Sequence, residues 1–522
     1  MQKESLETNK KLAQAAQLLK PSATSLAYAL FIASNATIIW GGSFPFLPLT
    51  FQTKSMTTSF FLAQALAFSM CFVIVFATQL LRKPGSKPRK YRLVTIPTVP
   101  YLMGWCCLIA AMYIPDSFQT LAICGGAFTG FGAAGLMLVW VRLFCAKPRR
   151  YGAGLITQSL LYAPIIYWLL TAIPTAIAVF LMPSVVTPLI VLALMLESRD
   201  TEFNGAMFTQ APQEAPKVYR NVFHDYWRLA LCIATFGFAC GVMRSLVIED
   251  ASIGSIVNNI SMAGSFICAG AFFYFWNYKT IRFNAGTFYR CLFPFVTAAF
   301  FLLPFAQQIS NSYSFVLAGS LYAIYTVCFA LIVIQCGQAA RTRSVNPLFM
   351  FCLIGGIVYL GHDFGFVSGQ FAENLAIPGA DKYASIALVA IFIMALMYYI
   401  GQGGWKAAAS PNQAQVEHIE LIASAHSPEA RKRASAGDQA GNNREIIDKT
   451  SKGCMAVAEQ FNLSEREAEV MELIVRGHTV NRIAEELLVS VNTVRTHSKR
   501  LYAKLDVHKK QQLRDLVEKY TP

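Results

Sequence analysis

The stretch VSVNTVRTHSKRLYAKL, residues 489–505, determines how the last part of this chain folds. It predicts a helix that Ser490 can cap, with one apolar and one polar, cationic face. The apolar stripe consists of Val491, Val494, Leu501 and Leu505. The opposite face collects Asn492, Arg495, Thr496 and Lys499 at helical spacing.

Two shorter helices are predicted before it. In LSEREAEVMELIVRG, residues 463–477, Ser464 and Glu467 have the spacing of a capping box, and Gly477 is a helix stop. TVNRIAEELL, residues 479–488, predicts the second helix. Two short helices, a tight turn and a cationic third helix are the geometry that places a recognition helix in the major groove. Residues 490–510 carry six Lys or Arg and one Asp, so positive charge is concentrated where DNA would lie.

Over about sixty residues this region resembles the LuxR-type four-helix DNA-binding domain, and the whole chain is similar to membrane-bound LuxR-family regulators. The resemblance rests on LSEREAEV, the Gly, IAEEL, SVNTVRTH and KLDV. It implies that double-stranded DNA is a partner and that two copies pair when bound to it. The implied DNA-binding residues are Ser490, Asn492, Thr493, Arg495, Thr496, Lys499 and Lys504, with Arg495, Thr496 and Lys499 facing bases. The implied dimerisation residues, on the last helix, are Leu513, Leu516 and Val517.

The composition of the whole chain is that of a polytopic membrane protein. Hydrophobic residues make up 55% and charged residues only 14% of its 522 residues. The 13 cysteines show no metal-ligand spacing, so no metal or cofactor is expected. Since no paired carboxylates, nucleophile constellation or phosphate loop occurs in a plausible setting, the chain is not expected to be an enzyme.

Apolar stretches long enough to cross a bilayer recur through the first four hundred residues and predict about twelve transmembrane helices. They are expected near 24–49, 60–81, 93–113, 118–145, 152–171, 174–196, 226–248, 261–278, 286–305, 313–335, 348–367 and 383–401. The span count is least certain around 152–196. Lys and Arg concentrate in alternate short loops, which predicts a bacterial cytoplasmic membrane protein with both termini in the cytoplasm.

The polar segment 197–221 divides the predicted spans into two groups of six. This arrangement looks like that of the major facilitator transporters, in which a ligand cavity lies between the halves. The resemblance rests on topology alone, because the loop RKPGSKPRKYR lacks the signature of that superfamily. The hexapeptide GFGAAG, residues 130–135, matches a dinucleotide-binding pattern, but its apolar surroundings favour close helix packing instead.

Three ionisable residues fall in the middle of predicted spans, at a similar depth. They are Arg244, His362 and Asp363. Such side chains are costly in a bilayer unless they are paired or face a wet cavity. One interpretation is a small-ligand site or a proton-sensitive switch; the other is a structural ion pair, or Arg244 reaching toward the membrane surface.

The predicted organisation is therefore all-α. It comprises a cytoplasmic segment (1–23), a membrane domain (24–401), a flexible linker (402–458) and a helix-turn-helix domain (459–522). The preferred hypothesis is a membrane-tethered transcriptional regulator whose membrane domain, in contact with the lipid bilayer, senses a small ligand or the state of the membrane. Two alternatives remain: a transporter with a regulatory DNA-binding tail, and an inert anchor.

Overall fold

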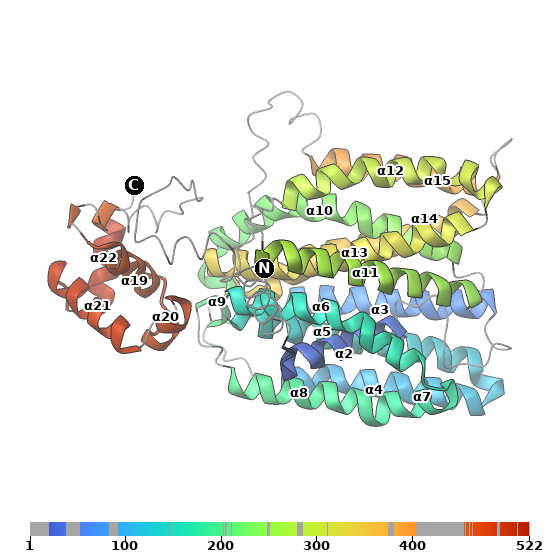
Figure 1. The fold of residues 1–522 in the computed structure, drawn as a ribbon, viewed down its shortest axis with the longest axis horizontal. Helices are drawn as coiled ribbons and strands as arrows, with labels where there is room; N and C mark the ends of the chain where they lie inside the picture. Colours follow the sequence, from blue (N-terminus) through green and yellow to red (C-terminus); the bar gives the residue numbers. More distant parts are fainter. Residues whose placement is uncertain are drawn as a thin grey trace, which may run out of the picture.

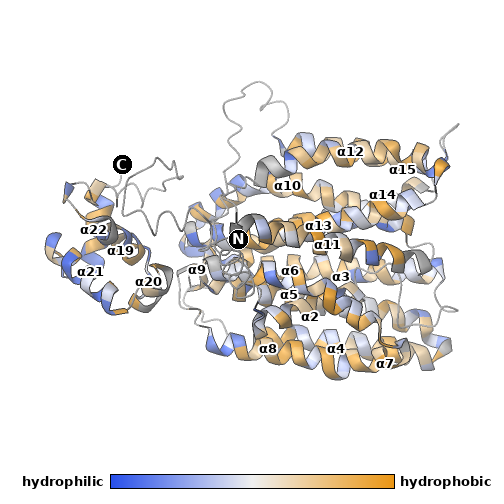
Figure 2. Ribbon diagram, viewed as in Figure 1, coloured by the Kyte–Doolittle hydropathy of each residue, from blue (hydrophilic) through white to orange (hydrophobic). Residues whose placement is uncertain are grey.

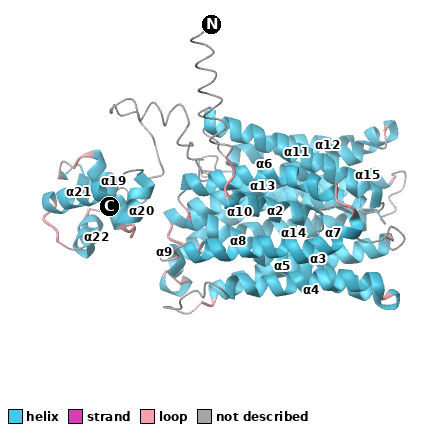
Figure 3. Cartoon of the chain, turned by 60° about the horizontal axis from the view of Figure 1, so that its bottom comes forward, coloured by secondary structure: helices cyan, strands magenta, loops and turns pink. Residues whose placement is uncertain are grey.

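A computed structural model describes most of the chain (Figure 1). The described residues are 20–37, 53–82, 92–147, 149–201, 203, 206–209, 211–247, 251–278, 285–310, 312–373, 381–402, 454, 456–458, 460–461, 463–487, 491–508 and 510–520. Helices account for nearly all of them, and no strand occurs in these ranges (Figure 3). The all-α prediction is confirmed.

The first half of the membrane domain contains six helical segments, of which all but α2 are, as described, long and apolar enough to span a bilayer. They are α2 (Ala23–Asn35), α3 (Lys54–Leu80), α4 (Arg92–Tyr113), α5 (Phe118–Ala146), α6 (Arg149–Thr171), and a sixth made of α7 (Thr175–Leu181), a π-helical turn (Met182–Val186) and α8 (Thr187–Asp200). The turn between α6 and α7 is only three residues long and ends at Pro174, which separates the two spans whose boundary was least certain.

The second half follows the short α9 (Ala206–Thr209). It consists of α10 (Pro216–Val247), α11 (Ala251–Tyr278), α12 (Ala285–Ile309), α13 (Ser312–Thr342), α14 (Pro347–Glu373) and α15 (Lys382–Gly401). Eleven described helices are long and apolar enough to span a bilayer, and each coincides with a predicted span. The predicted first span is described only to residue 37, so the rest of it lies outside the described residues. Figure 2 shows hydrophobic residues over the length of these helices.

The two halves repeat the same packing. In the first half, α2 packs against α6 and α8, and α3 and α4 pack against α5. In the second half, α10 packs against α14 and α15, and α11 and α12 pack against α13. The halves meet where α3 packs against α14 and where α6 packs against α11. These two contacts are equivalent, because α3 in the first half corresponds to α11 in the second and α6 corresponds to α14. The predicted division into six plus six is therefore confirmed by internal two-fold symmetry.

The glycines of GFGAAG pack helices together. A Cβ atom on Gly130 would lie 2.3 Å from the Gln64 carbonyl oxygen of α3, and one on Gly132 would lie 2.5 Å from Tyr101 of α4. A Cβ atom on Gly135 would lie 2.4 Å from Pro97. Only hydrogen fits at these positions, which confirms the helix-packing interpretation over a nucleotide loop.

The C-terminal domain has a hydrophobic core of its own. Its helices are α19 (Glu465–Val475), α20 (Val480–Leu487), α21 (Val491–Lys504) and α22 (Lys510–Lys519). Cys454 and Val457, which precede α19, are buried in this core. Both residues precede the predicted boundary at 459, which stays a prediction. The predicted linker lies almost wholly outside the described residues.

Candidate functional site: a helix-turn-helix and a cavity between the halves

The first helix of the C-terminal domain begins and ends where its sequence predicts. Glu467 N–H donates to the Ser464 hydroxyl oxygen (3.3 Å), and the Glu467 carboxylate accepts from the Ser464 N–H (2.9 Å), which completes the capping box. At the other end Gly477 adopts φ +94, and His478 N–H donates back to the Leu473 carbonyl (3.0 Å). This left-handed Gly turns the chain toward α20.

The two faces of α21 are those predicted. Val494 and Leu501 are buried against α19 and α20, while the cationic residues point outward. Exposed on α21 are Asn492, Arg495, Thr496, Lys499, Arg500 and Lys504, with Thr493 half-buried. The Thr496 hydroxyl donates to the Asn492 carbonyl (2.9 Å) within the helix. Ser490 lies outside the described residues, and Figure 2 shows the hydrophilic character of α21.

Lys504 is already engaged inside the domain. Its Nζ lies 2.7 Å from Oε2 of Glu467, whose side chain is only 4% exposed. The hydrogen bond from Lys504 and those at the cap lower the pKa of Glu467 from 4.5 to about 2. A phosphate contact by Lys504, which stays a prediction, would compete with this pair.

This pair predicts a pH-dependent stability. Because the pKa of Glu467 is lowered on folding, its carboxylate stabilises the domain above pH 4.5, and this contribution is lost as the pH falls through about 2. Glu467→Gln keeps a capping side chain but removes the ion pair, so it should lower the free energy of unfolding at pH 7 by about 1–2 kcal/mol. Urea denaturation of fragment 446–522 measures this. The difference in the free energy of unfolding between Glu467→Gln and wild type should shrink at low pH. Glu518→Gln, at an exposed position, is the control. A difference that does not depend on pH would contradict the assignment of the ion pair.

The residues predicted for dimerisation lie in or against the core of the C-terminal domain. Leu513 and Val517 are buried in the domain's own core, and the half-buried Leu516 packs against the same core. The exposed side of α22 is polar, with Gln511, Gln512, Asp515 and Glu518. A pairing contact through α22 stays a prediction.

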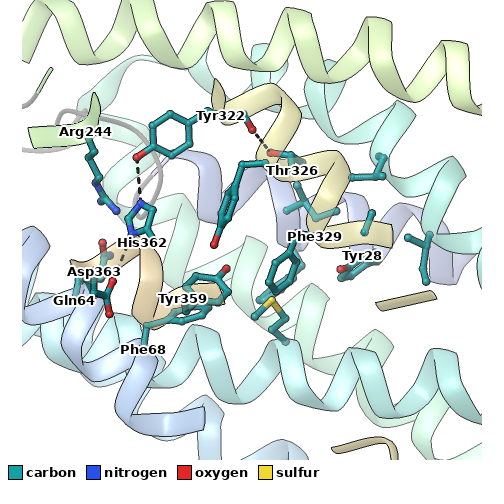
Figure 4. Close-up of a pocket in the computed structure, with 18 residues that line it drawn as sticks. Tyr28, Gln64, Phe68, Arg244, Tyr322, Thr326, Phe329, Tyr359, His362 and Asp363 are labelled. Carbon is teal, nitrogen blue, oxygen red and sulfur yellow. Dashed lines mark hydrogen bonds and ion pairs between the residues drawn. The ribbon is translucent and has the colours of Figure 1, made fainter. Parts of the chain in front are cut away.

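The three ionisable residues of the membrane domain line one cavity between the two halves (Figure 4). The empty space between its lining atoms has a volume of about 830 Å³, which includes the opening to solvent. Helices of both halves contribute: α2, α3, α5 and α6 on one side, α10, α13 and α14 on the other. Arg244, His362 and Asp363 are each no more than 6% exposed. The structure thus brings together three residues that were selected from two different predicted spans.

These polar side chains are held by specific neighbours. The Tyr322 hydroxyl lies 3.4 Å from Nε2 of His362, and Nδ1 of His362 lies 3.4 Å from Oδ1 of Asp363. Oδ2 of Asp363 accepts a hydrogen bond from Ser69 of α3, which joins the two halves. The Arg244 guanidinium lies 4.3 Å from the centre of the Phe61 ring. His362 and Asp363 are therefore neighbours within the cavity wall, so a structural role and a ligand-binding role for these residues are not exclusive.

Most of the cavity wall was missed by sequence reasoning. Seven lining side chains are aromatic: Tyr28, Phe31, Phe68, Tyr322, Tyr325, Phe329 and Tyr359. Three of these recur on α13 at helical spacing, which is a signal that the sequence contains. Gln64, one of the few polar residues in its apolar span, was also missed.

One end of the bundle has a contact that connects the halves near this cavity. Arg341, in the last turn of α13, donates to the Cys145 carbonyl (2.6 Å from Nη2) and to the Lys147 carbonyl, at the end of α5. Asn346, just after α13, donates to Gln79 at the end of α3 (2.9 Å). A cation on helix-terminal carbonyls is a favourable cap. Since α13 also lines the cavity, it links the cavity to this inter-half contact.

Comparison with known proteins agrees with the geometry of the C-terminal domain. Residues 461–517 match the family model of bacterial regulatory proteins of the luxR family. The response regulator UvrY of Escherichia coli strain K12 is 43% identical over 47 residues, which are 9% of this chain and 22% of UvrY. The oxygen regulatory protein NreC of Staphylococcus carnosus is 36% identical over 70 residues, 13% of this chain and 32% of NreC. The chain thus spans a third or less of the length of these relatives.

Among solved structures, the fucose:proton symporter FucP of E. coli covers 73% of this chain and 96% of its own, at 15% identity and a TM-score of 0.43. FucP in the outward conformation gives a TM-score of 0.42 at 14% identity. These values are too low to support an argument about function. The family match, the exposed cationic face of α21 and the eleven apolar helices lead to one statement: this chain carries a LuxR-type helix-turn-helix domain over residues 461–517, in the same polypeptide as a multi-pass membrane domain.

Proposed function

We propose that this protein is a membrane-tethered transcriptional regulator rather than an enzyme, and that a small molecule in the cavity between the halves controls DNA binding by the C-terminal domain. The observation that carries the proposal is the presence, in one chain, of a LuxR-type domain with an exposed cationic helix and a membrane domain with a cavity lined from both halves. A ligand that prefers one arrangement of the halves shifts the population toward that arrangement.

On the DNA side, Arg495 and Lys499 of α21 are suited to guanine in the major groove. Thr496 also faces bases, and Asn492, Thr493 and Lys504 hold phosphates, so the affinity for DNA falls steeply as the salt concentration rises. A single helix-turn-helix covers only a half-site. Two copies therefore bind a two-fold symmetric or tandem site as a homodimer.

On the membrane side, the distribution of charge supports a cytoplasmic location for both termini, in a bacterial cytoplasmic membrane. Lys and Arg gather at one end of the spans, for example Lys147 after α5, Arg341 in the last turn of α13 and Arg343 after that helix. A ligand that contacts α13 affects this end of the spans through Arg341, which lies on the same helix. A change there alters how the tail is presented to DNA or to a second copy.

The test is transcription in the native host. A deletion strain is complemented with the full-length protein, with the Arg495→Ala, Lys499→Ala double variant, or with residues 446–522 alone, and its messenger RNA is sequenced. The proposal expects only the full-length protein to restore regulated expression. Full, signal-dependent regulation by the soluble tail would instead mean that the membrane domain is an inert anchor.

A transporter function has one observation in its favour, the repeated halves around a central cavity. Uptake of a radiolabelled inducer into membrane vesicles separates the two functions. Accumulation that is abolished by Asp363→Asn would make the protein a transporter with a regulatory tail. Binding without accumulation supports a sensor.

A further inference from the structure

The cavity contains buried polar groups without protein partners. Gln64 of α3 is 1% exposed and lines the cavity next to Asp363 (Figure 4). Within the described part of the chain, neither its Nε2 nor its Oε1 has a hydrogen-bond partner, and the hydroxyl of Tyr325 on α13 also has none. An unpaired amide in such a place destabilises the protein by itself. A ligand that forms hydrogen bonds with these groups would remove this destabilisation.

The charged groups of the cavity are differently placed, because they already have partners. Asp363 accepts from Ser69 and lies beside His362, and Arg244 lies over the Phe61 ring. One cation and one carboxylate also leave the polar end without a strong net charge. Among the uncharged groups of the cavity, the amide of Gln64 and the hydroxyl of Tyr325 have no hydrogen-bond partner in the described part of the chain.

The rest of the wall is aromatic. The Tyr359 ring lies 4.4 Å from that of Phe68 and 5.2 Å from that of Phe329, measured between centroids. Figure 4 shows these rings on one side of the polar group formed by Arg244, His362 and Gln64. Such walls favour a flat ring through stacked and edge-on contacts. A sugar would bury many hydroxyl groups against this surface without partners.

We propose that this cavity binds an uncharged, ring-containing molecule whose amide or hydroxyl group bonds to Gln64 and Tyr325, with its ring among Phe68, Phe329 and Tyr359. The proposal deepens the proposed function, which assigns ligand binding to this cavity, by naming the class of ligand.

The first test compares probes that share a ring and differ in charge. Benzamide, benzoate and benzylamine are added at millimolar concentration to the full-length protein in lipid nanodiscs, with glucose as an uncharged ring that carries several hydroxyl groups, and the Tm of the protein is recorded. Benzamide should raise the Tm while the other three do not. A larger rise with benzoate, benzylamine or glucose, or no rise with any probe, would overturn the proposal.

The second test uses three variants. Gln64→Leu removes the unpaired amide, so it should raise the Tm of the ligand-free protein by a few degrees and weaken benzamide binding by about tenfold or more. Tyr325→Phe should weaken binding without lowering this Tm. Gln335→Leu is the control, because Gln335 is also buried with an unpartnered Oε1 but does not line the cavity; it should leave the benzamide effect intact.

A lower ligand-free Tm for Gln64→Leu would mean that the amide has a structural partner, and the proposal would fail. These measurements involve no DNA. Failure here therefore leaves the assignment as a regulator standing, and failure of DNA binding in the cell leaves the ligand assignment standing.

Discussion

Replacing Arg495 and Lys499 together by alanine is expected to lower the affinity of the full-length protein for its DNA site by at least about 100-fold. Both side chains are exposed on α21, one turn apart on the face opposite the buried Val494 and Leu501. Each good bidentate contact to a base contributes about 1–3 kcal/mol of discrimination, so losing two removes most of the specificity. The fold should survive, because neither side chain belongs to the core.

The measurement is a titration of fluorescent DNA, selected from a random pool by the wild-type protein, at several salt concentrations. Lys519→Ala is the control, since Lys519 is exposed on α22, away from the recognition helix. It should retain nearly full affinity. If the double variant still preferred the selected DNA over random DNA as strongly as wild type, α21 would not be the element that reads bases.

Gly241→Ala is expected to destabilise the membrane domain severely. A Cβ atom at Gly241 would lie 2.0 Å from the His362 carbonyl oxygen and 2.7 Å from the Phe366 nitrogen, so α10 and α14 must separate to admit it. Overpacking of a well-packed contact typically costs about 1–3 kcal/mol, and backbone atoms yield less than side chains do, so we expect about 3 kcal/mol. The same separation would move Arg244 away from His362 and Asp363.

The result is measured as the Tm and yield of the purified full-length protein. Gly270→Ala on α11 is the matched control, because its Cβ would meet only a Leu161 methyl group at 3.9 Å, an ordinary contact. That variant should keep its Tm or gain slightly from the better helix propensity of alanine. Equal Tm values for the two variants would contradict the close α10–α14 contact.

Much of the architecture can be predicted from the sequence because hydrophobic length is a strong signal. Every described span coincides with a predicted one, and the capping box at Ser464 and the stop at Gly477 have the predicted geometry. Arg244, His362 and Asp363 could be selected because ionisable residues in a bilayer need a reason to be there.

Other features could not be predicted, because the hydrophobic pattern of a sequence does not say which neighbour an apolar side chain contacts. Leu513 and Val517 lie on an apolar face of α22, and the pattern alone does not distinguish a domain core from a dimer interface. In the spans, an apolar side chain can face either lipid or a cavity, so the helical spacing of Tyr322, Tyr325 and Phe329 on α13 does not by itself identify a cavity wall. Gln64 is informative only once its missing partners are known.

The glycines of α10 and α14 had a readable pattern that was overlooked. Gly237 and Gly241 on one helix, and Gly361 and Gly365 on the other, each have the four-residue spacing that brings transmembrane helices close together. They place the backbone of His362 against α10, and so build the polar end of the cavity.

Chromatin immunoprecipitation of the tagged full-length protein in its own host tests the central claim most directly, beside the Arg495→Ala, Lys499→Ala variant at equal abundance in the membrane. A membrane-tethered regulator should give discrete peaks at promoters, and these peaks should disappear in the variant. Absence of wild-type peaks across several growth media, with the protein present in the membrane, or peaks that persist unchanged in the variant, would contradict the account.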